Sequence, residues 1–212
     1  MTNILEDVVS RRLIPVAMIE DPAAAGPLAD ALVAGGLPCA EITLRSPAAL
    51  QALAAMARRG DVLVGAGTVL TAGQARQALD AGARFLVAPG LDPALVAFCR
   101  EAKVPLLPGV CTPTEIQTAL GLGLDTVKFF PAEAFGGVAT LRALGAVFPM
   151  VRFVPTGGIA AANLAAYLAL PQVAACGGSW IVDRGLIVQG RFGEIRRRVA
   201  GSMHIVHQDG EL

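Results

Sequence analysis

The hydrophobic residues of this chain are grouped in short runs that recur at regular intervals. Successive runs start roughly 20 to 26 residues apart, the length of one strand, one loop and one helix. The runs predict strands near 13–19, 39–44, 62–67, 85–90, 105–110, 126–131, 151–156 and 173–177. Alanine-rich segments of helical character separate them. Near-continuous hydrophobic strands that alternate with helices indicate a parallel sheet covered on its outer face.

Proline and glycine mark the ends of the predicted helices. Four helix starts have a capping oxygen directly before a proline, at Asp21, Ser46, Asp92 and Thr112. Glu115, three residues after Thr112, completes a capping-box pattern. Glycines follow the predicted helices at Gly35-Gly36, Gly60, Gly82 and Gly121.

Eight such units predict an α/β fold, a compact (β/α)8 TIM barrel in a single domain, 1–212, with an N-terminal helix. Residues 204–212 are predicted to form a C-terminal tail. An open doubly wound sheet is the alternative. Its dinucleotide-binding fingerprint is missing, because Gly65-Ala66-Gly67 is followed by Leu70 where the third glycine would stand.

Composition narrows the class of protein. The 212 residues are 54% hydrophobic and 16% charged, which is typical of a globular chain. Mean hydropathy is +0.60, yet no apolar run reaches the roughly 18 residues of a membrane span, so we expect no membrane partner. With 17 basic and 17 acidic residues and no basic stripe, the sequence predicts no nucleic-acid partner.

The expected location is the cytoplasm. Acidic residues come early in the chain and no long apolar core accompanies them, so we expect no signal peptide. Cys39, Cys99, Cys111 and Cys176 are widely separated and form no CxxC pair. We expect reduced, mostly buried thiols that act as small hydrophobic residues.

Lysine is rare in this sequence. Only Lys103 and Lys128 are lysines, and Lys128 lies in the apolar run Thr126–Pro131. One interpretation is a buried structural lysine paired with an acid. The other is an imine-forming amine, because burial disfavours the ammonium, lowers its pKa and frees the nucleophile. Arginine cannot replace lysine in that role, because its guanidinium does not deprotonate.

Alternation along the strands places an acid near this lysine. Glu41 and Arg45 share one strand face, and Lys128 shares another with Phe130, so Phe129 should pack outward against the helices. If both faces point into the barrel, Glu41 and Lys128 meet at its mouth. Glu41 is then either a counter-charge or a general acid/base. Arg45 is either a solvated charge or a clamp for a substrate carboxylate.

Two glycine-rich turns follow the last two predicted strands. One is Pro155–Ile159, with Gly157 and Gly158, and the other is Gly177–Trp180, with Gly178 and Ser179. They are either tight turns only or a phosphate site, which recurs at this position in barrel enzymes. A metal site is not expected, because the only histidines, His204 and His207, lie far from the strand ends.

Several motifs together resemble the 2-keto-3-deoxy-6-phosphogluconate (KDPG) aldolase / 4-hydroxy-2-oxoglutarate aldolase family. They are EITLRSP (41–47), VGAGTVLT (64–71), PGL (89–91), PGVCTPTE (108–115), VKFFPAEAFGG (127–137), VPTGGI (154–159) and GGSW (177–180). The resemblance covers nearly the whole chain. It implies a class I aldolase of the Entner–Doudoroff pathway that acts on a phosphorylated 2-keto acid. It also implies a compact barrel, a homotrimer, and no cofactor beyond a lysine imine.

The resemblance also implies roles for individual residues. Lys128 is similar to the Schiff-base lysine and Glu41 to the acid/base glutamate. The predicted substrate-binding residues are Arg45 and Thr68 for the pyruvate carboxylate, Pro89 and Phe130 for the pyruvate pocket, Thr156 for the substrate hydroxyls or aldehyde end, and Gly157, Gly158, Gly178 and Ser179 for the phosphate.

Other functions stay open at this point. An aldolase for the galactonate-derived isomer also resembles this chain, although Arg45 and Ser179-Trp180 favour the gluconate type. Cleavage of unphosphorylated 4-hydroxy-2-oxoglutarate is compatible with the same motifs. A barrel epimerase or isomerase for sugar phosphates would share the phosphate turns without imine chemistry. A non-enzymatic sugar-phosphate sensor that keeps the fold is a further alternative.

Overall fold

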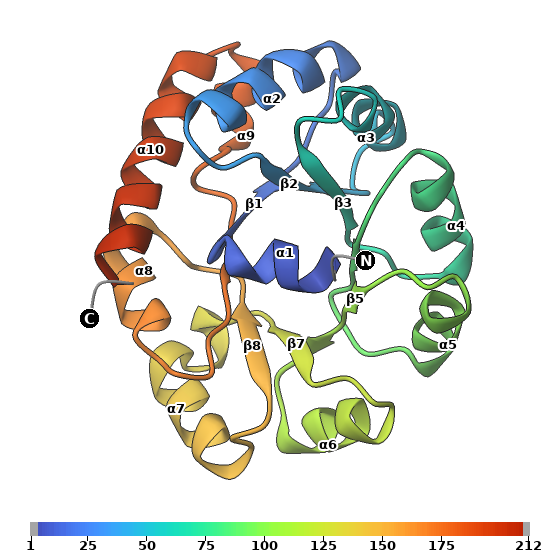
Figure 1. Ribbon diagram of the computed structural model, residues 1–212, viewed down its shortest axis with the longest axis vertical. Helices are drawn as coiled ribbons and strands as arrows, with labels where there is room; N and C mark the ends of the chain where they lie inside the picture. Colours follow the sequence, from blue (N-terminus) through green and yellow to red (C-terminus); the bar gives the residue numbers. More distant parts are fainter. Residues whose placement is uncertain (1–3, 210–212) are drawn as a thin grey trace.

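The computed structural model describes residues 4–209. Helices form an outer ring around parallel strands, and one further helix lies across the centre of the ring (Figure 1). Every predicted strand region contains an observed strand. The strands are β1 (Leu13–Ala17), β2 (Cys39–Thr43), β3 (Leu63–Gly67), β4 (Leu86–Val87), β5 (Leu106–Leu107), β6 (Gly109–Val110), β7 (Thr126–Phe129), β8 (Arg152–Pro155) and β9 (Cys176–Gly178).

Helices follow the strands in alternation, as the sequence predicts. They are α1 (Ile4–Ser10), η1 (Pro22–Ala24), α2 (Ala25–Ala34), α3 (Ala49–Ala57), α4 (Ala72–Asp80), α5 (Pro93–Glu101), α6 (Pro113–Gly121), η2 (Glu133–Phe135), α7 (Gly137–Val147), α8 (Ala161–Leu168), α9 (Arg184–Val188) and α10 (Phe192–Asp209), where η denotes a 3-10 helix. α1 is the expected N-terminal helix.

The strands form a curled parallel sheet. Six of them pair in the order β5-β4-β3-β2-β1-β9, and three more pair as β6-β7-β8. β1 pairs with both β2 and β9, so the first strand of the chain contacts the last. An open doubly wound sheet reverses its order at a switch point instead. The α/β class and the parallel strands are therefore confirmed, whereas the complete (β/α)8 barrel stays a prediction.

Proline divides one predicted strand. The region 105–110 forms β5 and β6, which are separated by Pro108. Proline has no backbone N–H to donate to a ladder, so the pairing is interrupted at this residue. β5 pairs with β4, and β6 pairs with β7, so this segment connects the two sheets.

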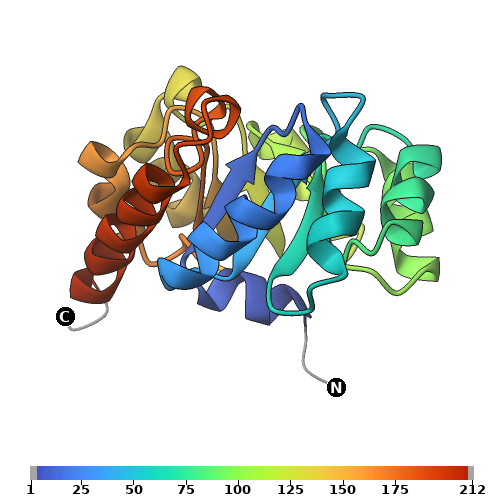
Figure 2. The same cartoon turned by 90° about the horizontal axis from the view of Figure 1, so that it is seen from above.

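Two hydrophobic clusters stabilise the fold. The larger lies between the strands and the surrounding helices and extends from Leu13 to Val206. The smaller contains inward-facing residues such as Ile14, Phe85 and Val154 together with Val8 of α1. α1 therefore closes one end of the strands (Figures 1 and 2). α1 does not cover the opposite end, where the carboxyl ends of the strands lie, and this end is the expected place for a binding site.

Most predicted helix boundaries are confirmed, and two are wrong. Asp21, Asp92 and Thr112 accept the expected capping hydrogen bonds, and the capping box with Glu115 is formed. Ser46 caps no helix, because its hydroxyl donates to the Ile19 carbonyl and α3 begins at Ala49. Gly121 does not follow its helix, because it is the last residue of α6. The glycine with a left-handed backbone after this helix is Gly123, with a φ of 73°.

The C-terminal tail prediction is also wrong where the structure describes it. Residues 204–209 continue α10, and the predicted segment 210–212 lies outside the described residues. α10 packs Ile195, Val199 and Val206 into the core, and this burial extends the helix through both histidines. The single-domain assignment of 1–212 stays a prediction.

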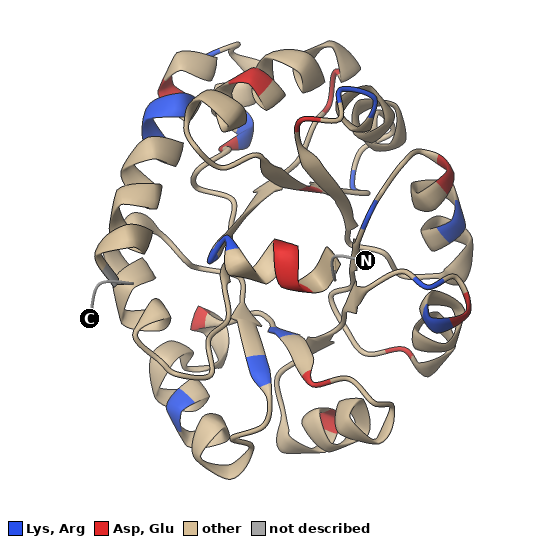
Figure 3. Ribbon diagram, in the orientation of Figure 1, with Lys and Arg blue, Asp and Glu red and all other residues tan. Residues whose placement is uncertain are grey.

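Charged residues are spread around the ring of helices with both signs interspersed (Figure 3). Within residues 4–209, no helix combines the length and the apolar character that crossing a membrane requires. Within residues 4–209, no disulfide bond links Cys39, Cys99, Cys111 and Cys176, and all of them except Cys111 are buried, as expected.

Candidate active site

A cavity of about 400 Å³ lies at the carboxyl ends of the strands. All predicted site residues except Gly178 line it: Glu41, Arg45, Thr68, Pro89, Lys128, Phe130, Thr156, Gly157, Gly158 and Ser179. They come from the ends of β2, β3, β4, β7, β8 and β9. Because parallel strands finish at the same end of the sheet, residues far apart in the sequence converge on this cavity.

Lys128 and Glu41 meet inside the cavity. The Lys128 Nζ lies 3.8 Å from the Glu41 Oε1, and the two side chains are only 8% and 4% exposed. The distance is that of an ion pair and is too long for a hydrogen bond. The Glu41 Oε1 is buried and has no hydrogen-bond partner among the described residues. This carboxylate oxygen is therefore available to a substrate proton.

Burial and charge act on Glu41 in opposite directions. Burial raises its pKa above the ordinary value, and the neighbouring Lys128 ammonium partly offsets this rise. A carboxyl group with a raised pKa exchanges protons more readily near neutral pH than an exposed one. Glu41 is thus suited to shuttle protons next to an amine.

Glycine makes room for the glutamate. A Cβ atom on Gly67, the last residue of β3, would lie 2.0 Å from the Glu41 Oε1. β2 and β3 pair with Thr43 opposite Gly67, so the Glu41 side chain leans along the sheet across this glycine. Any larger residue at position 67 would displace the carboxylate from the cavity.

Thr68 adopts a strained backbone conformation. Its φ is 57°, in the left-handed region that a β-branched residue rarely adopts. Such conformations cost on the order of 1–3 kcal/mol and cluster at functional sites. Thr68 lines the cavity directly after Gly67, so the strain lies where the sequence predicts a contact with the substrate carboxylate.

The phenylalanines after Lys128 point in different directions, as alternation predicts. The Phe130 ring lines the cavity, and its centre lies 5.0 Å from the Lys128 Nζ. Phe129 is fully buried in the layer between the strands and the helices. One apolar wall of the amine therefore comes from Phe130, and an ammonium at this distance is attracted to the ring face.

Arg45 is exposed at the cavity mouth and forms no ion pair with the described residues. Its guanidinium is consequently available to an anionic group of a ligand. Thr156, in contrast, is only 8% exposed. A Cβ on Gly177 would lie 2.3 Å from the Thr156 Oγ1, so this glycine makes room for the threonine hydroxyl.

Gly178 does not line the cavity. A Cβ there would lie 1.7 Å from the Trp180 ring, so packing against the indole requires glycine. Its phosphate-binding role stays a prediction. The structure adds four lining residues that the sequence prediction missed: Val16, Thr43, Ile159 and Gly177. Strand alternation could have found Thr43, which shares a face with Glu41, and its hydroxyl donates to the Ala17 carbonyl at 3.1 Å.

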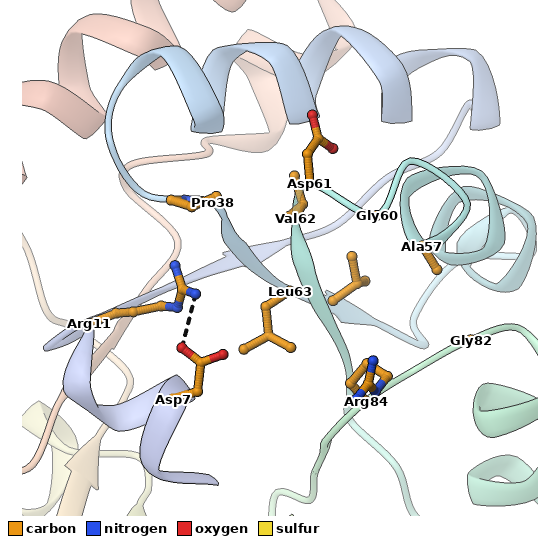
Figure 4. A pocket seen from close by; sticks show the side chains of 11 residues that line it. Asp7, Arg11, Pro38, Ala57, Gly60, Asp61, Val62, Leu63, Gly82 and Arg84 are labelled. Atoms are coloured by element: carbon orange, nitrogen blue, oxygen red, sulfur yellow. Dashed lines mark hydrogen bonds and ion pairs between the residues drawn. The ribbon is translucent and has the colours of Figure 1, made fainter. Parts of the chain in front are cut away.

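Another cavity, of about 290 Å³, lies at the opposite end of the strands beside α1 (Figure 4). None of the predicted site residues lines it. Asp7 and Arg11 form an ion pair at 3.0 Å, and Asp61 accepts a hydrogen bond from Arg59 at 2.8 Å. Its acidic groups are thus already paired, and the site at the carboxyl ends is the better candidate for catalysis.

Histidine and carboxylate side chains do not gather into a metal site in the part of the chain that the structure describes. No group of three or more His, Cys, Asp or Glu side chains there is arranged to hold an ion. His204 lies on α10, where its ring nitrogen is 2.9 Å from the Gln208 side-chain nitrogen.

Comparison with known proteins identifies the family. The family model described as "Aldolase: KDPG and KHG aldolase" matches residues 4–198. The 2-dehydro-3-deoxy-phosphogluconate aldolase of Treponema pallidum is 48% identical, and the match covers 97% of this chain and 99% of that protein.

Solved structures of aldolases are also similar to this chain. A KDPG aldolase from Legionella pneumophila, with pyruvate captured as a covalent carbinolamine intermediate, superposes with a TM-score of 0.91. It is 42% identical, and the match covers 95% of this chain and 98% of that one. A structure described as native KDPGal has a TM-score of 0.85 at 27% identity, with 94% and 96% covered. The chain belongs to the KDPG and KHG aldolase family.

Proposed function

We propose that this chain is a class I aldolase that cleaves 2-dehydro-3-deoxy-6-phosphogluconate to pyruvate and D-glyceraldehyde 3-phosphate in the Entner–Doudoroff pathway. The observation that carries the proposal is the buried Lys128 amine, 3.8 Å from the Glu41 carboxylate inside the cavity. Relatives named as 2-dehydro-3-deoxy-phosphogluconate aldolases support the substrate. The covalent pyruvate adduct of the Legionella enzyme supports the imine.

The reaction begins with attack of the neutral Lys128 amine on the C2 ketone of the substrate. Glu41 takes a proton from the attacking nitrogen and gives it to the C2 oxygen, which forms the neutral carbinolamine. A further proton, taken up from solvent through Glu41, converts the C2 hydroxyl into a water molecule. Water leaves, and a cationic iminium joins C2 to Lys128. The iminium is the electron sink, so the proposed reaction needs no metal ion and no separate cofactor.

Cleavage follows from the iminium. Glu41, directly or through a water molecule, removes the proton of the C4 hydroxyl. The C3–C4 bond breaks, its electrons move into the C2–C3 bond as an enamine, and glyceraldehyde 3-phosphate departs. Protonation of C3 and addition of water to C2 then release pyruvate and the free amine. The Phe130 wall limits the access of water to the enamine.

The cavity has separate groups for the two ends of the substrate. Arg45 and Thr68 bind the pyruvate carboxylate, for which the planar guanidinium is well suited. Pro89 and Phe130 enclose the pyruvate carbons. Thr156 contacts the hydroxyls or the aldehyde end. These assignments are supported by the shared cavity.

The phosphate binds between the two glycine-rich turns. Gly157 and Gly158 have φ values of 99° and 80°, which turn the backbone sharply after β8. The N–H groups of Gly158 and Ser179 donate to no backbone acceptor within residues 4–209, so they are available to an anion. Gly178 contributes by allowing the close packing of Trp180 behind Ser179.

We propose further that the two sheets close into a complete (β/α)8 barrel. β5 and β6 are covalently continuous through Pro108. On the other side, single parallel bridges join Phe153 to Val173 and Thr156 to Gly177, next to β8 and β9. These contacts support closure with short ladders at both junctions.

The oligomer and the location follow from the family resemblance. A homotrimer would cover large apolar side chains that are exposed in the single chain, such as Val147, Met150 and Val188. Sedimentation analysis measures the mass directly, and a monomer at working concentration would contradict the trimer. Cysteines without disulfide bonds support a cytoplasmic location, where thiols stay reduced.

Replacement of Lys128 by arginine tests the imine. Lys128→Arg keeps a positive charge beside Glu41, so we expect the fold to persist, as measured by circular dichroism. The guanidinium cannot form the imine, and kcat for KDPG cleavage should fall about 10³-fold or more. Lys103→Arg, at a helix end away from the cavity, is the matched control and should keep full activity. Substantial turnover by folded Lys128→Arg would rule out imine catalysis.

The raised pKa of Glu41 predicts the pH dependence. Glu41 removes the C4 proton only as a carboxylate, so kcat/KM should rise with pH through the pKa of Glu41. Because burial raises this pKa, the acid limb should lie above the ordinary range of glutamate. Glu41→Gln should lower kcat by about 10²–10⁴-fold and remove that limb. An acid limb that persists unchanged in Glu41→Gln would assign the base to another group.

Parallel assays of three substrates test the substrate assignment. The gluconate-derived substrate should have the highest kcat/KM, ahead of its galactonate-derived isomer. Unphosphorylated 4-hydroxy-2-oxoglutarate should be cleaved with a kcat/KM lower by about 10-fold or more, because the phosphate contacts are missing. Equal or faster cleavage of the galactonate-derived substrate would reassign this chain to the other branch of aldolases.

A further inference from the structure

Glu133 and Tyr167 form a pair directly behind the Gly157-Gly158 turn. Tyr167, on α8, is fully buried and is the only tyrosine of the chain. Its hydroxyl donates a hydrogen bond to the Glu133 Oε1. Glu133 begins η2, five residues after Lys128. The pair therefore connects the segment that carries the catalytic lysine with a neighbouring helix of the outer ring (Figure 1).

Glu133 also contacts the turn itself. Its backbone N–H donates to the Gly157 carbonyl at 3.0 Å. A Cβ on Gly158 would lie 2.5 Å from the Glu133 Cβ, so Gly158 rests directly against the glutamate stem. Both glycines line the cavity. The Glu133 backbone and the start of its side chain therefore pack directly against the turn.

Gly137 packs against both groups of the pair. A Cβ on Gly137 would lie 2.7 Å from the Tyr167 hydroxyl and 2.8 Å from the Glu133 Oε1. Burial, together with the hydrogen bond to Glu133, raises the pKa of Tyr167, so the phenol remains a donor at physiological pH. Such a pair holds the carboxylate in one orientation, because a buried hydroxyl without its acceptor would be costly.

Hydrogen bonds from Asn163 also hold the Gly157-Gly158 turn. The Asn163 side-chain amide donates to the Gly158 carbonyl at 3.1 Å, and its Oδ1 accepts from the Ala160 N–H at 2.8 Å. With both carbonyls of the glycine pair occupied as acceptors, the turn has a fixed orientation. The Gly158 N–H, which donates to no backbone acceptor within residues 4–209, belongs to this fixed turn at the cavity wall.

We propose that Glu133 and Tyr167 are positioning residues that hold the Gly157-Gly158 turn and thereby set the preference for a phosphorylated over an unphosphorylated 2-keto acid. The inference rests on the proposed aldolase function. Neither side chain lines the cavity, so each acts through the turn. Imine formation at Lys128 with pyruvate, which has no phosphate, does not depend on the pair.

Tyr167→Phe removes only the hydroxyl and tests the proposal. KM for the phosphorylated substrate should rise about 10-fold or more, which corresponds to one hydrogen bond to a charged group. kcat/KM for 4-hydroxy-2-oxoglutarate should stay within about twofold. Borohydride trapping of the pyruvate imine should be unchanged. Glu133→Ala should give the same selective loss, whereas Glu133→Gln keeps an acceptor oxygen and should restore most of the preference.

Ser202→Ala is the matched control, because it removes a different buried hydroxyl, on α10, away from the pair. It should leave the ratio of kcat/KM for the phosphorylated and unphosphorylated substrates unchanged. If Tyr167→Phe does not fold, Glu133→Ala tests the proposal instead. Glu133 is exposed, so we expect its replacement to leave the fold intact. An unchanged substrate ratio, or an equal loss with both substrates, overturns the positioning role. Failure of the wild-type enzyme to cleave the phosphorylated substrate would instead overturn the proposed function.

Discussion

The structure of the site depends on one constraint: an amine and a carboxylate are buried together at the end of a parallel sheet. Burial of either charge alone would be strongly unfavourable, so Lys128 and Glu41 need each other. Their 3.8 Å separation leaves the Glu41 Oε1 without a hydrogen bond. The pair is therefore incompletely satisfied, and the Glu41 Oε1 can accept a hydrogen bond or a proton from a substrate.

The surrounding chain adjusts to this pair. Gly67 has no side chain that would collide with the Glu41 carboxylate where it crosses β3. Gly177 likewise leaves space for the Thr156 hydroxyl. Thr68 accepts a left-handed backbone at the cavity wall. Each of these costs some intrinsic stability. The hydrophobic layer between strands and helices, together with the cluster closed by α1, supplies the stability that offsets these local costs.

Local rules predicted much of this site from the sequence. Strand alternation placed Lys128 and Phe130 on the inner face and Phe129 on the outer one, because side chains in a strand alternate strictly. The same rules failed where a distant group decides. The sequence around Ser46 predicts a helix cap, but in the fold its hydroxyl donates to the distant Ile19 carbonyl instead. The contact of Tyr167 with Glu133 joins residues 34 positions apart, which no local pattern reveals. Likewise, the packing of Gly178 against the Trp180 ring follows from the folded structure and from no local pattern.

The most direct test of the central claim is to identify the residue that becomes covalently bound to pyruvate. The enzyme is incubated with pyruvate, reduced with borohydride, digested and analysed by mass spectrometry. One reduced pyruvate adduct is expected, on the peptide that contains Lys128, and none on the peptide that contains Lys103. Folded enzyme that cleaves its substrate without any adduct, or with an adduct only on another residue, would contradict imine catalysis at Lys128.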